Sequence, residues 1–305
     1  METKNVWKNY NARQLKECET VNAQYKEFLD SGKTERECVD TIVDMAERSG
    51  YVELSEKLKG RKGLKKGDKI YAVNMNKSIV LFNIGSGPLS AGMNILGAHI
   101  DSPRMDVKSN PLYEDSSIAF LDTHYYGGVK KYQWVTIPLS LHGVIVKKDG
   151  KTVELSIGED EDDPVFFVSD LLIHLAAKQL EKKGKDVIEG EALDIIVGNR
   201  PLVVRGQKKN DDDKKEKDPV KAMILKILKD EYGVEEEDFL SAELEVVPAG
   251  KARDAGLDKS MILAYGQDDR VCAFTSLYAF LECADVNRTS CLILTDKEEI
   301  GRAHV

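Results

Sequence analysis

The stretch Asn94-Ile-Leu-Gly-Ala-His99-Ile-Asp101-Ser-Pro-Arg104 joins a short apolar run directly to side chains that can bind a ligand. Two other stretches have the same design. They are Met261-Ile-Leu-Ala-Tyr-Gly-Gln-Asp268-Asp269-Arg270 and Cys291-Leu-Ile-Leu-Thr-Asp296-Lys-Glu298-Glu299-Ile-Gly301. Ligands of open α/β sheets bind just beyond the carboxyl ends of the strands. If the three strands are parallel neighbours, we expect their ends to gather one imidazole and several carboxylates in one crevice.

These residue types point to a divalent metal. Carboxylates held a few ångströms apart repel one another, and a cation removes that cost. Imidazole with carboxylates suits zinc, with cobalt and manganese as alternatives. Asp101 lies two residues after His99 and can accept the other ring N–H of that histidine. The side chains of Glu298 and Glu299 point in different directions, so one can bind a metal while the other holds a proton as general base.

Each stretch also has a structural interpretation. His99 can be a core histidine, Asp269 can be the N-cap of a helix, and residues 296–299 can be a solvated turn. Their joint occurrence at three predicted strand ends favours the metal site. The sequence contains no G-x-x-x-x-G-K-[ST], G-x-S-x-G or G-x-G-x-x-G motif, so it gives no signal for a phosphate loop, a nucleophile elbow or a dinucleotide fold.

The hydrophobic pattern predicts the elements around these stretches. In the first fifty residues, apolar side chains recur at helical spacing. Gly32 is predicted to end the first helix, and Thr34 and Glu37 have the spacing of a capping box that starts the second. Short strands are predicted over residues 69–76, 78–84, 93–100, 261–265 and 290–295. Asp269 is predicted to cap a helix whose apolar face consists of Val271, Phe274, Leu277, Tyr278 and Leu281.

The middle of the chain has a different residue pattern, which predicts a mainly β insertion. Strands are predicted over residues 135–141 and 143–147, and a helix from Pro164 to about Gly184. The charged run from Gln207 to Asp218 is predicted to be a solvated loop. A further helix is expected to start at Asp218 and Pro219. The fold class is therefore α/β, a mixed sheet flanked by helices and interrupted by this insertion.

Composition excludes several classes of function. The 305 residues are 42% hydrophobic and 32% charged, which suits a folded chain with a sizeable core. The net charge is -9, so the chain lacks the excess of basic residues expected of a protein that binds nucleic acid or an anionic membrane. The N-terminus shows no secretory signal, and no apolar run is long enough to span a membrane. The five cysteines form no C-x-x-C pair and indicate reduced thiols in the cytoplasm.

At these residues the sequence resembles the aspartyl aminopeptidase / aminopeptidase I family of zinc metallopeptidases (metallopeptidase family 18). The stretches that carry the resemblance span nearly the whole chain: GAHIDSPRMD, THYYGGVKKYQW, VSDLLIHLA, GQDDRVCAF and LTDKEEIG. The resemblance implies a zinc-exopeptidase-like catalytic domain in two parts, 1–102 and 251–305. Residues 103–250 would be an inserted dimerisation domain, and dimers would build a homododecamer.

The resemblance also implies roles for individual residues. His99 corresponds to a ligand of one metal, Asp268 to the carboxylate that bridges two metals, and Glu299 to a ligand of the other. Glu298 corresponds to the general base, and Asp101 to the partner that orients His99. Asp269 follows where the family has an acid or an amide. His174 resembles a histidine that reaches the active site of a neighbouring subunit.

The end of the sequence departs from the family pattern. The resemblance implies two further ligands, an Asp and a late His, whereas this sequence stops at Gly301-Arg-Ala-His-Val305. We therefore expect a chain truncated at its C-terminus, and we do not count His304 as a replacement ligand. The leading hypothesis is an aminopeptidase that removes N-terminal residues from peptides with a metal-activated water. The alternatives are an inactive fragment that only self-associates and a dinuclear-metal deacylase of acyl-amino acids.

Overall fold

The chain forms two compact units. The structure, a computed structural model, describes residues 5–59, 63–203, 217–283 and 286–302. The first unit comprises residues 1–102 and 251–298. The second comprises residues 103–250 and 299–305. The first unit is therefore discontinuous in sequence, and most of the second lies between its two pieces.

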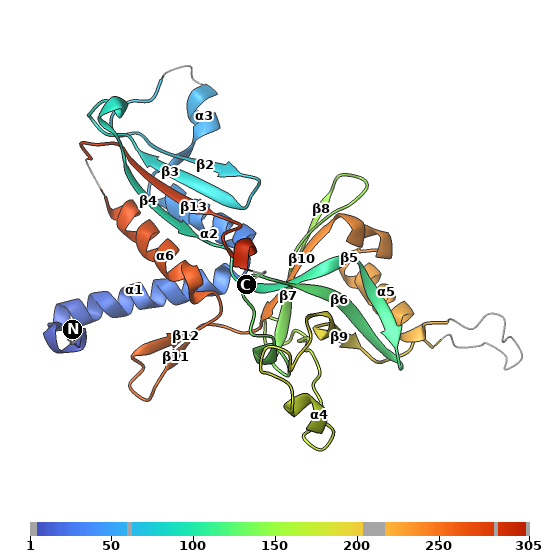
Figure 1. The fold of residues 1–305 in the computed structure, drawn as a ribbon. Coiled ribbons are helices and arrows are strands. Elements are labelled where there is room, and N and C mark those ends of the chain that lie inside the picture. The colour runs from blue at the N-terminus through green and yellow to red at the C-terminus, as the bar shows by residue number, and fades with distance from the viewer. Residues whose placement is uncertain (1–4, 60–62, 204–216, 284–285, 303–305) are drawn as a thin grey trace, which may run out of the picture. The chain divides into compact units, whose positions relative to one another are not determined.

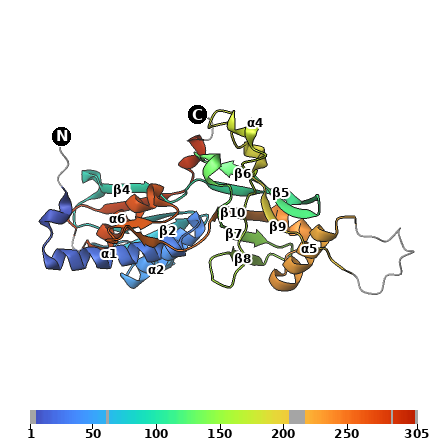
Figure 2. The same cartoon turned by 90° about the horizontal axis from the view of Figure 1, so that it is seen from below.

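The first unit begins with two helices whose boundaries follow from the sequence. Helix α1 (Ala12–Ser31) ends at Gly32, and α2 (Glu35–Arg48) starts from a capping box in which Thr34 and Glu37 each accept the other's backbone N–H. The predicted stop and capping box are thus confirmed. A short helix, α3 (Leu54–Lys59), and the long helix α6 (Gln267–Glu282) follow. Figure 2 shows α1 running beside α2 and α6.

A five-stranded mixed sheet forms the other layer of this unit, in the order β1-β2-β3-β13-β4 (Figure 1). Its strands are β1 (Val52–Glu53), β2 (Lys69–Asn74), β3 (Ser78–Asn83), β13 (Ser290–Thr295) and β4 (Asn94–His99). The strand predictions for residues 69–76, 78–84, 93–100 and 290–295 are confirmed. Strands β13 and β4 run parallel, with Thr295 opposite His99, whereas β3 runs antiparallel to β13. Both parallel strands therefore end at the same level of the sheet.

The core of the first unit lies between the helices and one face of this sheet. Phe274 of α6 packs its ring against Tyr25 and Phe28 of α1, with ring centroids 5.1 and 5.5 Å apart. Leu292 and Leu294 of β13 belong to the same buried cluster. Helix α6 buries Phe274 and Leu277 as predicted, but Val271 is exposed. The buried positions of α6 include Arg270 and Ala273 instead.

The second unit is built on a six-stranded antiparallel sheet, in the order β8-β7-β10-β5-β6-β9. Its strands are β5 (Arg104–Asp115), β6 (Ile118–Tyr126), β7 (Leu139–Val146), β8 (Thr152–Ile157), β9 (Ile195–Gly198) and β10 (Ala242–Pro248). Helix α5 (Pro219–Tyr232) follows Asp218, so the predicted helix start is confirmed. The mainly β character of this part of the chain is also as predicted.

Predictions for residues 135–184 are wrong in two respects. The helix predicted from Pro164 to Gly184 is reduced to α4 (Ala177–Leu180), and Leu171, Leu172, Ile173 and Leu175 before it are exposed. Residues 135–141 and 143–147 yield one strand, β7, because Gly143 is accommodated within the ladder at a φ of 136°. The strand predicted over residues 261–265 is present as β12 (Met261–Leu263), but it lies outside the five-stranded sheet. The predicted charged loop lies, from residue 207 to 216, outside the described residues.

The remaining pieces are short. A two-stranded antiparallel ribbon pairs β11 (Arg253–Ala255) with β12 (Met261–Leu263). Short 3-10 turns occur at Val6–Asn9, Leu89–Ala91, Lys131–Gln133, Gly190–Ala192, Glu236–Ser241 and Glu299–Arg302. Among the helices that the structure describes, none has the length and apolar character needed to cross a lipid bilayer.

The ring of Phe274 gives a test of this core. Because Phe274 is fully buried, Phe274→Ala should lower the free energy of unfolding of the first unit by about 3–5 kcal/mol. Val271→Ala on the same helix is the matched control, since Val271 is 42% exposed, and it should cost less than about 1 kcal/mol. Urea denaturation followed by circular dichroism measures both. Equal losses in the two variants would contradict this packing.

Candidate metal centre

His99 is the last residue of β4, and its two ring nitrogens have different surroundings. Nδ1 lies 3.1 Å from the backbone oxygen of Asp101 and 3.2 Å from its Oδ1. Nε2 faces Asp268 Oδ1 at 3.4 Å and Glu298 Oε2 at 3.8 Å. Both ring nitrogens face acceptors, and the shorter contacts, those of Nδ1, favour the tautomer with the proton on Nδ1. Nε2 then presents its lone pair toward the carboxylates, as a metal ligand requires.

Asp268 reaches this place by a route that differs from the predicted one. Strand β12 pairs only with β11 in a separate ribbon, so the prediction of three parallel neighbours is wrong for this strand. Asp268 instead lies in the first turn of α6, a helix that packs against β4. Its backbone oxygen accepts a hydrogen bond of 2.8 Å from Ser102 Oγ. Helix packing, rather than strand pairing, therefore brings this carboxylate to His99.

The start of α6 is irregular. The N-cap position is Gly266, and Asp268 and Asp269 both have non-helical backbone angles, with a cis peptide between them. The prediction that Asp269 is the N-cap is therefore wrong. The carboxylate of Asp269 instead accepts a hydrogen bond from the Cys272 thiol, and this bond raises the pKa of that thiol. The carboxylate of Asp268 remains directed toward His99.

Arg270 joins the start of α6 to the end of β4. Its side chain is buried, and it donates to the backbone oxygens of Ile100 at 3.2 Å and Lys33 at 2.9 Å. Sequence reasoning missed this residue and Ser102, although both stand inside the quoted stretches. The available signal was an arginine on an otherwise apolar helix face, because a buried guanidinium needs several acceptors. These contacts hold Asp268 close to His99.

The turn after β13 separates the two glutamates. The N–H of Asp296 donates to Ser78 Oγ at 3.1 Å, and Lys297 has a left-handed φ of 75°. The N–H of Glu298 then donates to Asp101 Oδ1 at 3.3 Å. The Glu298 side chain is 42% exposed, whereas Glu299 is buried. The adjacent glutamates thus occupy different environments, which is compatible with one acting as a metal ligand and the other as a general base.

Burial also affects the carboxyl group of Asp296 at the head of this turn. Desolvation raises its pKa, and the nearby carboxylate of Glu35 raises it further. Lys297 Nζ, 3.0 Å from Asp296 and 3.7 Å from Glu35, opposes this effect. One lysine therefore bridges two buried acids behind the turn that carries Glu298.

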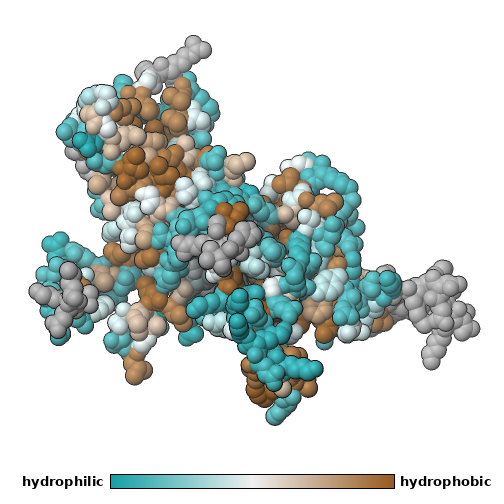
Figure 3. All heavy atoms as spheres, viewed as in Figure 1, coloured by the Kyte–Doolittle hydropathy of each residue, from teal (hydrophilic) through white to brown (hydrophobic). Residues whose placement is uncertain are grey.

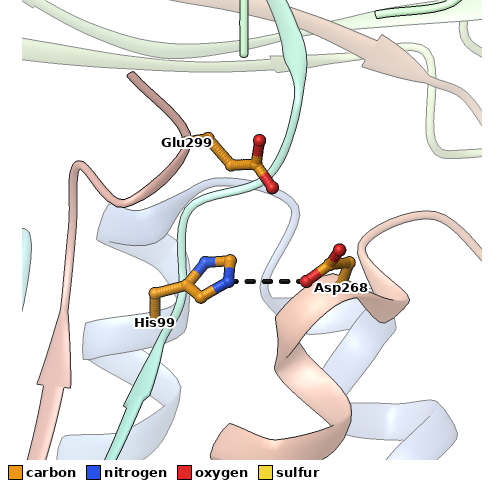
Figure 4. A group of neighbouring side chains, drawn as sticks. All are labelled: His99, Asp268 and Glu299. Carbon is orange, nitrogen blue, oxygen red and sulfur yellow. Dashed lines mark ion pairs between the residues drawn. The ribbon is translucent and has the colours of Figure 1, made fainter. Parts of the chain in front are cut away.

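Three side chains form a set that can hold a metal ion. His99, Asp268 and Glu299 each offer a ligand atom, and these atoms all lie within 4.8 Å of one another. Figure 4 shows the imidazole of His99 directed at the Asp268 carboxylate, with Glu299 beside them. One imidazole and two carboxylates are a donor set that zinc accepts. The residues present therefore fit a divalent metal, and Asp101 is placed to orient the imidazole.

The other histidines do not join this set within the described part of the chain. His174 is exposed in a turn between β8 and α4, and not in a helix as predicted. His124 is exposed on β6. His142 is buried in the second unit, with Nε2 3.1 Å from Ser140 Oγ and 3.2 Å from Glu159 Oε1.

Comparison with known proteins settles the family. The sequence model of the aminopeptidase I zinc metalloprotease (M18) family matches residues 28–304. The chain belongs to the M18 family. A relative from Clostridium acetobutylicum, "Probable M18 family aminopeptidase 1", is 55% identical over 300 residues, which are 98% of this chain and 63% of the relative. This chain therefore spans less than two thirds of that M18 relative's length.

Two crystal structures of M18 proteins have the same fold. The M18 aminopeptidase from Thermotoga maritima has a TM-score of 0.87 at 44% identity, over 99% of this chain and 62% of that one. Aminopeptidase I from Clostridium acetobutylicum has a TM-score of 0.86 at 51% identity, over 99% and 64%. The prediction of an α/β fold of this family is thus confirmed.

Removing one ligand should weaken metal binding. His99→Ala should lower zinc affinity by more than about 100-fold, since it deletes the imidazole from the His99, Asp268 and Glu299 set, and loss of a partner behind a ligand already costs about 10- to 100-fold. His124→Ala is the control, because His124 lies outside the set. Equilibrium dialysis with zinc measures both variants against the unmodified chain. An affinity for His99→Ala equal to that of the control would show that zinc binds elsewhere.

Gly127 gives a second test, directed at Glu299. A Cβ at Gly127 would lie 3.1 Å from both Cβ and Oε2 of Glu299, and Gly127 has a φ of 75°. Gly127→Ala should therefore displace Glu299 and lower zinc affinity about tenfold, a smaller loss than removal of a ligand. Gly128→Ala is the control, because a Cβ there meets nothing within 4 Å. The same dialysis should show unchanged affinity for Gly128→Ala, and an equal effect of both changes would refute the positional argument.

Proposed function

We propose that this chain carries the catalytic machinery of a metal-dependent aminopeptidase that removes N-terminal residues from peptides. Membership of the zinc metalloprotease family supports the reaction class. The observation that carries the proposal is the His99, Asp268 and Glu299 set, with ligand atoms within 4.8 Å of one another. An acid outside this set, Glu298, lies at its edge with its carboxylate accessible.

The proposed ligand roles divide these side chains between two divalent ions, zinc in the first instance. His99 would bind one ion, Glu299 the other, and Asp268 would bridge them. When bound, the ions would make water more acidic and polarise the carbonyl of the scissile peptide. The pairing of His99 Nδ1 with Asp101 at 3.2 Å supports the position of Asp101 behind the ligand.

Glu298 is proposed as the general base and then the general acid. Its carboxylate takes a proton from the attacking water, whose oxygen forms a bond to the carbonyl carbon. When the C–N bond breaks, Glu298 returns that proton to the leaving amine. The products are one free amino acid and a peptide shorter by one residue. The distance of 3.8 Å from Glu298 Oε2 to His99 Nε2 supports this role, since a general base must lie close to the water that the ions would hold.

Self-association is proposed for the second unit. The turn around His174 exposes Leu171, Leu172, Ile173 and Leu175, with 54–71% of each residue accessible. Figure 3 shows hydrophobic side chains gathered at the segment that includes α4. Apolar surface of this kind marks interaction sites. We propose that residues 103–250 act as a dimerisation domain that carries His174 to a neighbouring subunit, in a dodecamer built from dimers. The five cysteines are free, which supports a cytoplasmic location.

Substitution of the proposed base separates binding from chemistry. Glu298→Gln should keep two zinc ions per chain and lose at least about 100-fold in turnover of aminoacyl anilides, because the amide cannot accept the proton. Asp296→Asn is a control in the same turn, since Asp296 is outside the ligand set. Metal content by mass spectrometry and turnover on one sample give both readouts. Unchanged turnover of Glu298→Gln would refute the assignment, and absence of turnover in the unmodified chain would refute the proposed activity.

A further inference from the structure

The second unit contains a cavity of about 550 Å³ between its antiparallel sheet and α5. Residues of β6, β7, β8, β9 and β10 line one side, and α5 lines the other with Ile224, Ile227 and Leu228. Figure 1 shows α5 beside this sheet, and the helix contacts β5, β6 and β9. Ligand cavities in proteins usually have volumes of about 300–1,000 Å³, so this one has room for a small organic molecule.

The walls of the cavity are apolar. Leu121, Leu155 and Leu244 of the sheet line it, and each is no more than 4% exposed. Leu155 and Leu244 both pair with Gly143 of β7, which has no side chain to occupy the space between them. Empty apolar cavities exclude water and take up apolar molecules. The space therefore suits an alkyl or aryl group better than water.

Helix α5 is attached to the sheet at both ends, which keeps the cavity open. At its start, Glu114 Oε2 of β5 accepts the backbone N–H groups of Val220 at 2.8 Å and Lys221 at 3.0 Å. At its end, the side chain of Lys147, the residue after β7, donates to the backbone oxygen of Gly233. The middle turns of α5 cannot move onto the sheet without breaking these contacts.

The mouth of the cavity combines apolar surface with negative charge. Val165 and Phe167 line the cavity and are 50% and 42% exposed. Of the described residues that line it, Glu231 alone is charged, and it is exposed to solvent. Beside it, burial raises the pKa of Tyr232, and the carboxylates of Glu231 and Asp163 raise it further. A negative mouth repels a carboxylate and attracts an amine.

We propose that this cavity binds a small apolar molecule with an alkyl or aryl body and an amine head group. The body would lie between α5 and the sheet, and the amine beside Glu231. None of the described residues that line the cavity belongs to the set of His99, Asp268 and Glu299. The proposal therefore goes beyond the proposed peptidase activity and does not rest on it.

Fluorescence titration of the full chain with phenylnaphthylamine tests the cavity. This uncharged aryl dye brightens when it leaves water, and the unmodified chain should bind it saturably, with one molecule per chain. Ile227→Trp should bind it at least about tenfold more weakly, because the larger ring fills the space. Leu225→Trp, on the same helix but outside the lining residues, is the control and should bind normally.

Thermal unfolding followed by circular dichroism shows which variants are folded. If Ile227→Trp does not fold, Leu228→Phe adds less volume to the same wall and supplies the comparison. Absence of saturable binding by the unmodified chain overturns the proposal. Equal binding by the folded cavity-filling variant and by the control also overturns it. If dye is released as the concentration of the chain rises, a second copy occupies the site and the proposed ligand is wrong.

Decylamine and decanoate, which share an alkyl length and carry opposite charges, test the head group. Decylamine should displace the dye at concentrations at least about fivefold lower than decanoate, because Glu231 attracts one head group and repels the other. Glu231→Gln should reduce that preference and keep the affinity for the uncharged dye. Asp230→Asn, at the neighbouring position outside the lining residues, is the control and should keep the preference. Equal displacement by both compounds, or an unchanged preference in Glu231→Gln, would refute the assigned head group.

Discussion

The parallel pairing of β4 with β13 is the constraint on which the rest of the site depends. Its register sets Thr295 opposite His99, so the two strands end at one level of the sheet. The turn that follows β13 then brings Glu298 close enough to donate its N–H to Asp101. A shift of one residue would turn His99 to the other face of the sheet. The core positions of Ala98 and Ile100 oppose that shift, because it would turn both side chains out of the core.

The sequence predicted those elements whose local signals agree with their burial. The α2 start was found from Thr34 and Glu37, and β13 was found over residues 290–295, its full extent. The helix predicted after Pro164 failed because its apolar residues, such as Leu172 and Ile173, meet no partner layer and stay exposed. Helical spacing yields a helix only where one face is buried, since packing supplies most of a helix's stability.

The residue types of the site could be predicted from the sequence, but the elements that carry them could be predicted only in part. The motifs identified His99, Asp268 and Glu299, and the structure places their ligand atoms together. That Asp268 comes from an irregular helix start, and not from a third parallel strand, could not be read from Met261-Ile-Leu, which looks like any buried strand. The buried links of Arg270 to Ile100 and Lys33 depend on long-range packing, which a single sequence does not encode in its local pattern. The metal roles themselves stay predictions.

The discontinuity of the first unit has a consequence for the order in which the chain acquires structure. During synthesis α1, α2 and β2 to β4 emerge first, yet β13 and α6, which complete their core, emerge only after residues 103–250. The intervening segment holds its own antiparallel sheet and can fold as a unit while the ribosome is still translating. Tyr25 and Phe28 of α1 therefore lack their packing partner until Phe274 has been synthesised. For that interval the nascent chain exposes apolar surface, which makes it prone to aggregation.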